Sequence, residues 1–502
     1  MIRIKSCTIA GLHALPVDIE VDRSNGLPQL ITVGLPDASV REAKERIRTA
    51  IKNSGFEIPP EKITISLAPA DVKKEGAAFD LPMALGILAV NGIIPEVQLQ
   101  KFFFCGELAL DGKLRPFRGS LVLTSHFPKT SFVLPAACAK EAAWAKQTLV
   151  FPAQTLKEVV DFLNQKIILT PLKNNSLSVS SELANHADLN EVRGQRHVKR
   201  ALEIAASGRH HLLLIGAPGS GKTMLARRLP GILPPPSWEE TIELTKIKSL
   251  LENQLETGLV FSRPFRSPHH TSSSIALTGG GSHSKPGEVT LAHLGALFLD
   301  ELPEFKRDAL EALRSPIEDG CITVSRAKTQ ITYPSQFMLI AAMNPCPCGY
   351  LGDPLKRCRC SGNQIQKYQS KISGPILDRL DLQIEVPRIN SEMIRSEEIS
   401  EASSVVRMRV AAARQIQIKR NRGKLNAQLS PNEIRKWAWP SASGLDLIEQ
   451  AMKSLHLSAR AYFKILKMAR TIADLENVLV VEKKHIAEAI QYRSLDRGWW
   501  KN

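Results

Sequence analysis

LLLIGAPGSGKT, residues 212–223, is the stretch that decides the fold. It opens on an apolar run typical of a buried strand and continues into the pattern GxxxxGK[ST]. The glycines let backbone amides close around phosphate oxygens, Lys222 supplies a positive charge, and the Thr223 hydroxyl can bind Mg²⁺. The following residues, MLARRLPGIL, predict a helix whose N-terminus faces the phosphates. The sequence therefore predicts a strand, loop and helix that bind a nucleoside triphosphate and Mg²⁺. The residues expected at this site are Gly216, Ala217, Pro218, Gly219, Ser220, Gly221, Lys222, Thr223 and Met224.

Composition places the chain among soluble globular proteins. It has 502 residues, 43% of them hydrophobic and 23% charged, enough for about three or four domains. No apolar run is long enough to span a bilayer and the N-terminus lacks a signal-peptide pattern, so we expect a cytoplasmic protein without a membrane partner. The formal net charge of +16 is compatible with a polyanionic partner such as nucleic acid.

The pattern of elements divides the chain into four parts. Residues 1–168 alternate strand-like and helical stretches, which predicts a separate α/β domain. Residues 169–190 are polar and rich in Ser and Asn, as in a linker. Residues 191–388 predict an α/β ATPase core with a parallel sheet. Residues 389–502 predict a helical domain.

Two further strand ends carry residues suited to ATP hydrolysis. LAHLGALFLDE predicts a buried strand that ends in Asp300 and Glu301, a Walker B motif. Asp300 can hold Mg²⁺ and Glu301 can act as general base on the attacking water. The strand QFMLIAAMN ends in Asn344, which we interpret as the sensor 1 residue that orients this water.

Two arginines complete the predicted catalytic set. Arg379 lies between two aspartates in SGPILDRLDLQIEV, on a predicted helix that leads into a strand. It can form an internal ion pair, or reach the γ-phosphate bound by a neighbouring subunit. Arg460, near the start of an amphipathic helix, has the position expected of a sensor 2 arginine.

A basic stretch in the C-terminal part allows two interpretations. Residues 405–424 contain seven basic residues and no acidic one. They can form a nucleic-acid face, or a solvated helix whose charges meet acids elsewhere.

Together these motifs, with PFRSPHHTSSSIALTGGG and SARAYFKILKMARTIADLE, resemble the magnesium-chelatase-like AAA+ ATPases of the YifB/ComM family. The resemblance covers nearly the whole chain. It implies an AAA+ P-loop core with a helical lid, a homo-hexamer, and a central pore that grips single-stranded or branched DNA. Similar family members are helicases that promote branch migration of DNA taken up in natural transformation, so recombination or DNA-uptake proteins are possible partners.

The same resemblance places two projecting elements in the core. An insert corresponds to residues 262–286, and a hairpin before sensor 1 corresponds to residues 321–334. Arg326 and Lys328 at the hairpin tip are then expected against DNA phosphates, although a solvated turn would show the same residues. His269 and His270 in the insert could contact DNA or another subunit, or pack within the insert.

The first domain resembles the S5-like domain of Lon-type proteases, through APADVKKEGAAFDLPMALGIL and GELALDGKLRPFRG. When Gly76 is matched to the Lon glycine, Ala78 falls where the serine should be, and no lysine follows Gly119 at the expected place. A peptidase needs a nucleophile with its base, so we expect a non-proteolytic scaffold or DNA-contacting domain.

Four cysteines fall in one loop, residues 346–360, as Cys346, Cys348, Cys358 and Cys360. Two close pairs can offer four thiolates to a structural zinc, or remain reduced thiols, since disulfides are rare in the cytoplasm. The pairs depart from the commoner CxxC spacing. Lys356, Arg357 and Arg359 on the same loop are candidate DNA contacts.

Three functions from different classes are then distinguished. The leading expectation is a DNA helicase or translocase driven by ATP. The alternative is the motor subunit of a magnesium-chelatase-type complex, which by resemblance shares the ATPase fold but lacks the first domain and the cysteine loop. An ATP-dependent protease is disfavoured by the absent Ser–Lys pair.

Overall fold

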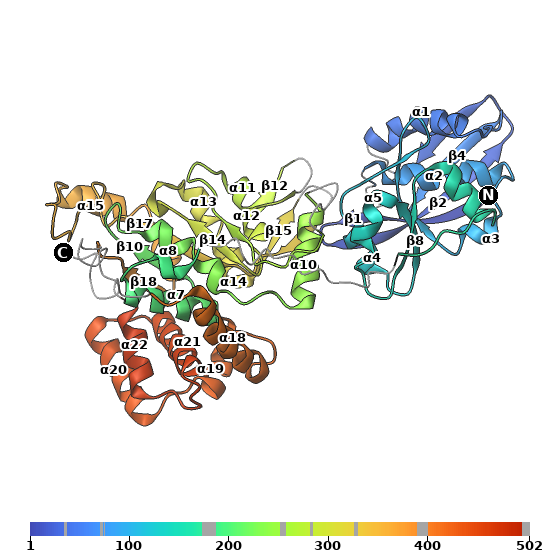
Figure 1. The fold of residues 1–502 in the computed structure, drawn as a ribbon. Coiled ribbons are helices and arrows are strands. Elements are labelled where there is room, and N and C mark those ends of the chain that lie inside the picture. The colour runs from blue at the N-terminus through green and yellow to red at the C-terminus, as the bar shows by residue number, and fades with distance from the viewer. Residues whose placement is uncertain are drawn as a thin grey trace. The chain divides into compact units, whose positions relative to one another are not determined.

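The computed structural model describes residues 1–34, 38–70, 74, 76–172, 187–251, 258–281, 285–325, 330–388 and 400–493. The chain forms two compact units. The first comprises Met1–Val179 and Trp238–Val260, and the second comprises Ser180–Ser237 and Phe261–Asn502. Figure 1 shows the elements of each unit.

The N-terminal unit is built on a seven-stranded mixed sheet in the order β3-β4-β2-β1-β5-β8-β9. β1, β2 and β4 pair antiparallel, and the other neighbours pair parallel. The strands are β1 (Ile2–Ala10), β2 (His13–Ser24), β3 (Gln29–Val33), β4 (Lys62–Ala68), β5 (Phe103–Phe104), β8 (Ser131–Pro135) and β9 (Leu149–Ala153). A short separate pair joins β6 (Glu107–Leu108) to β7 (Leu114–Arg115).

The helices of this unit pack through apolar side chains. In α1 (Ala38–Asn53), Val40, Ala43, Ile47 and Ile51 recur at helical spacing and are buried. α2 (Asp80–Val90) is buried over nearly its whole length and packs on β1 and β2. The other helices before residue 170 are α3 (Glu96–Leu99), α4 (Ser120–His126), α5 (Ala136–Ala142) and α6 (Leu156–Leu163).

Helix α10 (Trp238–Ser249) belongs to the N-terminal unit although its sequence lies inside the predicted ATPase core. It packs on α4, and the amide of Gly119 donates to the carbonyl of Ser249 at 3.0 Å. The Ser249 hydroxyl also contacts the buried carboxylate of Glu141, and Trp238 meets Trp144 edge to face. The N-terminal unit is therefore discontinuous in sequence, which the linear division at residues 168 and 191 did not anticipate.

The second unit contains a five-stranded parallel sheet in the order β11-β14-β17-β10-β18. Its strands are β10 (Leu212–Ile215), β11 (Phe265–Arg266), β14 (Ala296–Leu299), β17 (Met338–Met343) and β18 (Leu382–Glu385). β10, β14 and β17 are buried throughout, as expected of strands covered on both faces. The parallel sheet agrees with the α/β class predicted from the sequence.

Short elements connect the strands of this sheet. They are α8 (Lys222–Ala226), α9 (Leu229–Ile232), α11 (Ser274–Thr278), β12 (Gly279–Gly280), β13 (Lys285–Pro286), α12 (Glu288–Leu291), α13 (Arg307–Glu311), α14 (Arg314–Asp319), β15 (Cys321–Ser325), β16 (Gln330–Pro334), α15 (Gly362–Gln369) and α16 (Gly374–Leu377). The single helix expected after the phosphate loop is divided into α8 and α9. Pro230 explains the break, because its ring excludes the carbonyl of Ala226, where α8 ends.

The C-terminal residues of the second unit form helices that pack beside α7 (Arg196–Gly208), as Figure 1 shows. They are α18 (Ser403–Arg420), α19 (Pro431–Trp437), α20 (Ala442–Leu455), α21 (Ala459–Leu475) and α22 (Lys483–Gln491). One apolar core runs from β10 and β17 through α7 into α18 and α21. These helices and the sheet therefore pack as one body.

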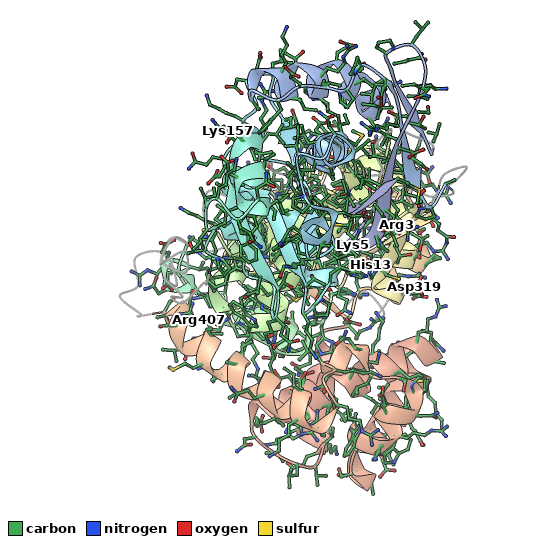
Figure 2. All side chains as sticks on the ribbon, turned by 90° about the vertical axis from the view of Figure 1, so that its right-hand side faces the viewer. Arg3, Lys5, His13, Lys157, Asp319 and Arg407 are labelled. Atoms are coloured by element: carbon green, nitrogen blue, oxygen red, sulfur yellow. The ribbon has the colours of Figure 1, made fainter. Side chains whose placement is uncertain are left out.

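Most basic side chains of α18 form ion pairs or hydrogen bonds within the chain. Arg409 pairs with Glu203 and Glu401, and Arg420 pairs with Asp474. Arg414 donates to the carbonyl of Ala206 and is buried. Arg407, near the start of the helix (Figure 2), reaches the carbonyl of Gly231. These contacts favour the interpretation of a helix whose charges meet partners elsewhere.

Candidate nucleotide site and cysteine cluster

The phosphate loop leaves the carboxyl end of β10, which lies between β17 and β18 in the sheet. In parallel sheets, ligands bind at this edge, where neighbouring connections diverge. Gly219 and Gly221 have φ of 78° and 93°, a region that other residues rarely adopt. At Gly216 a Cβ would lie 2.4 Å from the carbonyl oxygen of Val386. The loop therefore requires glycine at these positions.

Lys222 starts α8 and turns back over its own loop. Its Nζ donates to the carbonyls of Gly216 and Ala217 at 2.7 and 2.9 Å, and to Oδ1 of Asn344 at 3.2 Å. Burial lowers the pKa of Lys222 to about 8. A phosphate anion would supply the countercharge that this desolvated ammonium needs. The predicted phosphate-loop lysine and the sensor 1 asparagine thus lie together.

Thr223 and Asp300 form the second contact of the site. Thr223 Oγ1 donates to Asp300 Oδ2 at 2.6 Å, and Asp300 follows directly after β14. Hydroxyl and carboxylate oxygens are the donors that Mg²⁺ prefers, so this pair fits a magnesium ion. The adjacent Glu301 has a φ of 54°, and its amide donates to Asp300 Oδ1 at 3.0 Å.

Glu301 has a partner that the sequence did not reveal. Its Oε2 lies 3.3 Å from Nδ1 of His270, in the segment that follows β11. β11 pairs parallel with β14, so the residues after both strands meet at one edge of the sheet. His269 lies beside His270 with ring centroids 4.1 Å apart and ring planes 34° apart. The His270 contact is with the Walker B glutamate, whereas the sequence left its role open.

Arg379 lies in the turn between α16 and β18, after the helix on which it was expected. Its Nη2 pairs with Glu318 of α14 at 2.5 Å, and its Nη1 donates to the carbonyl of Pro375 at 2.7 Å. Only 8% of the residue is exposed. The internal ion pair that the sequence allowed is therefore present in the chain.

Arg460 occupies the first turn of α21. Its Nη1 lies 3.7 Å from Oδ2 of Asp378, and both side chains are largely exposed. The hydroxyl of Ser458 caps the helix by accepting from the amide of Ala461. Asp378 directly precedes Arg379. The contact between Arg460 and Asp378 therefore brings Arg460 next to the turn that carries Arg379.

The four cysteines of the loop converge on one point. Sγ of Cys346 lies 3.4 Å from that of Cys348 and 3.6 Å from that of Cys358, and the Cys348–Cys358 distance is also 3.6 Å. Cys360 accepts from the amide of Cys348, and the four sulfurs lie within 4.8 Å of one another. Thiolates about 2.3 Å from a tetrahedral zinc are about 3.8 Å apart. The cluster fits that ion.

The loop around the cluster is fixed by side-chain contacts. Asp353 accepts from the amides of Leu355 and Lys356 and pairs with Arg388 at 2.8 Å. Lys356 and Arg388 both lie over the ring of Tyr350. The candidate DNA contacts Lys356, Arg357 and Arg359 are exposed on this loop.

The insert and the hairpin before Asn344 lie side by side where the structure describes them. A Cβ on Gly280 of β12 would lie 3.8 Å from both Ile275 and Val324. β15 and β16 pair antiparallel from Cys321 to Ser325, which forms the expected hairpin. Arg326 and Lys328 fall outside the described residues.

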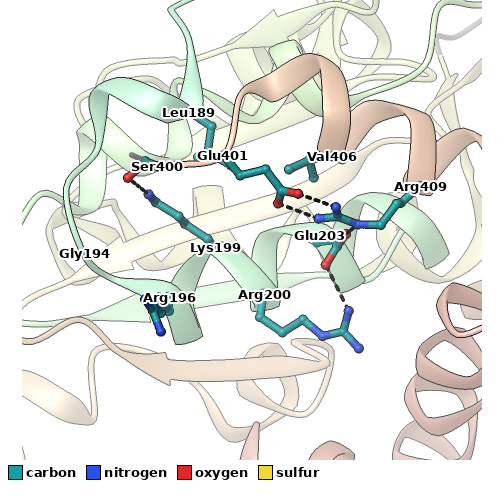
Figure 3. Close-up of a pocket in the computed structure, with 10 residues that line it drawn as sticks. All are labelled: Leu189, Gly194, Arg196, Lys199, Arg200, Glu203, Ser400, Glu401, Val406 and Arg409. Carbon is teal, nitrogen blue, oxygen red and sulfur yellow. Dashed lines mark hydrogen bonds and ion pairs between the residues drawn. The ribbon is translucent and has the colours of Figure 1, made fainter. Parts of the chain in front are cut away.

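A cavity of about 330 Å³ lies between α7 and the start of α18 (Figure 3). No residue of the phosphate loop lines it. Glu203 bridges Arg200 and Arg409, Glu401 pairs with Arg409, and Lys199 donates to the Ser400 hydroxyl. Its lining carries four basic and two acidic side chains, and the cavity is distinct from the site for phosphates because the two share no residue.

In the N-terminal unit, the region matched to Lon is held by an ion pair. Arg46 forms two hydrogen bonds to the buried Asp80, at 2.6 and 3.0 Å. Burial raises the pKa of Asp80 to about 6, against the opposing effect of Arg46. Across the described ranges, no helix is long and apolar enough to cross a membrane.

Three family descriptions match consecutive parts of the chain. They are "Subunit ChlI of Mg-chelatase" at residues 19–137, "Magnesium chelatase, subunit ChlI" at residues 188–394, and "Magnesium chelatase, subunit ChlI C-terminal" at residues 400–493. A stretch of 54 residues is also 39% identical to the archaeal Lon protease of Thermococcus kodakarensis, covering 11% of this chain and 8% of that protein.

Full-length relatives define the family more closely. The chain is 44% identical to the competence protein ComM of Haemophilus influenzae over 495 residues, covering 97% of this chain and 96% of the relative. It is 45% identical to the protein YifB of Salmonella typhimurium over 493 residues, with the same coverage. The chain therefore belongs to the YifB/ComM family of magnesium-chelatase-like AAA+ ATPases.

Proposed function

We propose that this protein hydrolyses ATP and uses the energy to move DNA strands, as a cytoplasmic hexamer that promotes branch migration. The observation that carries the proposal is the convergence of Lys222, Thr223, Asp300 and Asn344 at the ends of adjacent parallel strands. Each offers the chemistry that phosphoryl transfer needs, namely positive charge, magnesium ligands and a polar group near the attacking water.

In this proposal each residue has one task. Lys222 neutralises the β- and γ-phosphates, and Thr223 and Asp300 hold Mg²⁺, which supplies charge neutralisation when bound. Glu301 accepts a proton from water as general base, and Asn344 orients that water. His270 contacts this base from the insert.

Arg379 acts on the ATP of the neighbouring subunit. To reach this ATP, the Arg379 guanidinium leaves the Glu318 carboxylate and binds the γ-phosphate. One charge-assisted hydrogen bond is thereby replaced by another. Arg460 also approaches the phosphates, either in its own subunit or in the next, as the sensor 2 residue of a helical lid formed by residues 389–502.

DNA binding is supported by the positive charge of the chain and by its sequence similarity to a competence protein. The chain has a formal net charge of +16, and exposed Lys356, Arg357 and Arg359 cluster on the cysteine loop. The insert and the hairpin carrying Arg326 and Lys328 form the other contacts in the pore. The relative from Haemophilus influenzae is named a competence protein, which supports a role in recombining DNA taken up during transformation.

The remaining parts of the chain support this motor. Zinc held by Cys346, Cys348, Cys358 and Cys360 stabilises the basic loop, a structural role because all four ligand positions are protein thiolates. The N-terminal unit serves as a Lon-like, non-proteolytic scaffold. DNA-uptake or recombination proteins are the partners that this role requires.

The alternative is an ATPase motor for metal insertion, favoured by the chelatase descriptions of all three families. The N-terminal unit no longer argues against it, because residues 19–137 match a chelatase family. The cysteine cluster and the full-length kinship with ComM remain the features that favour DNA.

Turnover of ATP with and without DNA separates the two functions. A DNA motor should hydrolyse ATP faster with single-stranded or branched DNA, and added salt should weaken that stimulation. Replacing Lys356, Arg357 and Arg359 by Gln should reduce DNA affinity while leaving turnover without DNA unchanged. If the protein binds neither single-stranded, duplex nor branched DNA at low salt, the proposal is wrong.

A further inference from the structure

Two aspartates flank Arg379, and both contact the same helix. Asp378 Oδ2 lies 3.7 Å from Arg460, and Asp381 Oδ1 lies 2.8 Å from Nζ of Lys464. Arg460 and Lys464 are one turn apart on α21 and share one face of that helix. The turn that carries Arg379 is therefore joined to the first turns of α21 at two points.

The contact between Asp381 and Lys464 is the buried one of the two. Their side chains are 8% and 17% exposed, whereas those of Asp378 and Arg460 are 44% and 64% exposed. Burial opposes ionisation of Asp381, yet the Lys464 ammonium holds the pKa of its carboxyl well below the usual range. An exposed pair contributes little free energy, while breaking a buried pair is costly. The Asp381–Lys464 pair therefore holds α21 to the turn of Arg379 more firmly than the Asp378–Arg460 pair does.

Asp381 is also bound firmly to the sheet. Its carboxylate accepts from the backbone amide of His211 at 2.9 Å, and its own amide donates to the His211 carbonyl at 2.9 Å. His210 Nδ1 lies 3.6 Å from the same carboxylate, and its Nε2 lies 2.8 Å from the Thr471 hydroxyl on α21. Helix α21 is thus tied to the core two turns beyond Lys464 as well.

We propose that Asp381 and Lys464 are positioning residues that make Arg379 and Arg460 move together. Lys464 fixes α21 to Asp381, which lies two residues after Arg379 and directly before β18, so a shift of α21 on contact with phosphate also shifts Arg379. The inference rests on the proposed function, in which Arg379 acts on the neighbouring subunit. The Asp381–Lys464 pair then transmits to Arg379 the nucleotide state that α21 senses.

Mixed rings test whether the pair acts on the neighbouring site. Chains carrying Lys222→Ala, which lack a working ATP site of their own, are co-assembled with wild-type chains at increasing ratios. The same doping is repeated with Lys222→Ala chains that also carry Arg379→Ala, Lys464→Met or Lys467→Met. Lys467 is the matched control, because it is a partly buried lysine on α21 whose Nζ donates to the Ala427 carbonyl rather than to Asp381.

The inference expects Lys464→Met to lower ATP turnover per wild-type subunit as steeply as Arg379→Ala does. Chains with Lys467→Met should lower ATP turnover per wild-type subunit no more than chains that carry Lys222→Ala alone. If Lys464→Met follows the Lys467→Met control instead, the inference is overturned. If Arg379→Ala has no effect, action of Arg379 in trans is wrong and the inference falls with it, whereas DNA binding and DNA-stimulated turnover still test the proposed function.

A double variant separates positioning from stability. Lys464→Met leaves a buried carboxylate without its counter-charge, whereas Asp381→Asn with Lys464→Met removes both charges and should recover part of the lost melting temperature. The inference expects turnover in the mixed rings to stay low in the double variant. Turnover that returns together with stability would show a merely structural pair.

Discussion

Glu301 is the residue on which ATP turnover should depend most directly. Its side chain is 58% exposed at the sheet edge, and it contacts His270 without an internal cation to neutralise it in the described residues. Glu301→Gln keeps the size and removes the basicity. We expect ATP binding to persist while turnover falls about 100-fold or more, as for loss of a general base.

Glu304→Gln is the control for that change. Glu304 lies three residues further on, is exposed, and pairs with Lys371 at 3.1 Å. Its loss should leave turnover unchanged. Binding of a fluorescent ATP analogue and release of phosphate measure the two effects, and undiminished hydrolysis by Glu301→Gln would remove the general-base role.

Arg46 should matter more at neutral pH than in acid. In Arg46→Met the Asp80 carboxylate stays buried without its counter-charge, at a cost of about 2 kcal/mol. The folded-state pKa of Asp80 is raised above its unfolded value, to about 6. Protonation below that pH therefore favours the folded state, so the destabilisation should be larger at pH 8 than at pH 5.

Urea midpoints at the two pH values, followed by hydrogen exchange in the N-terminal unit, measure this difference. Arg3→Met is the control, since Arg3 pairs with Glu20 at the surface, and such pairs contribute little. An equal deficit for Arg46→Met at both pH values would contradict the assignment of its effect to Asp80.

At the scale of elements, the cysteine loop should depend on metal. Four thiolates within zinc-binding distance predict about one zinc per chain, lost together with loop order in Cys346→Ser. Cys321→Ser, outside the cluster, is the control. Elemental analysis and proteolysis of the loop report the outcome, and a metal-free protein with an intact loop would refute the zinc site.

Helix α10 should stabilise the N-terminal unit, to which it is joined through Ser249. Ser249→Ala leaves the buried Glu141 carboxylate short of one donor, which should cost about 1–2 kcal/mol. Glu239→Ala on the same helix is exposed and should be neutral. Hydrogen exchange of the amides of α4 and α10 measures the effect of each substitution. Equal protection in both variants would show that the contact between Ser249 and Glu141 does not stabilise the unit.

For the whole molecule, local patterns predicted most of the fold. The phosphate loop, the Walker B strand and Asn344 follow apolar runs whose ends meet at one edge of a parallel sheet, and the structure brings Lys222, Thr223, Asp300 and Asn344 together there. Their catalytic roles remain predictions. α1 also shows the regular apolar spacing of a helix, whereas α2 is buried on all sides.

What the sequence did not predict depends on contacts between distant segments. Glu318 lies 61 residues before Arg379 and His270 lies 31 before Glu301, so no local spacing marks these pairs. The membership of α10 in the N-terminal unit has the same cause, because its partners Gly119, Glu141 and Trp144 precede it by about a hundred residues. Such contacts are set by tertiary packing rather than by periodicity.

The central claim is that ATP hydrolysis at this site moves DNA strands. A three-strand branch-migration assay tests it most directly, with wild-type protein and Glu301→Gln compared in the presence of ATP and Mg²⁺. We predict that the wild-type protein exchanges strands only with hydrolysable ATP, and that Glu301→Gln binds the DNA without exchanging it. Wild-type protein that hydrolyses ATP but leaves the three-strand substrate unchanged would contradict the claim.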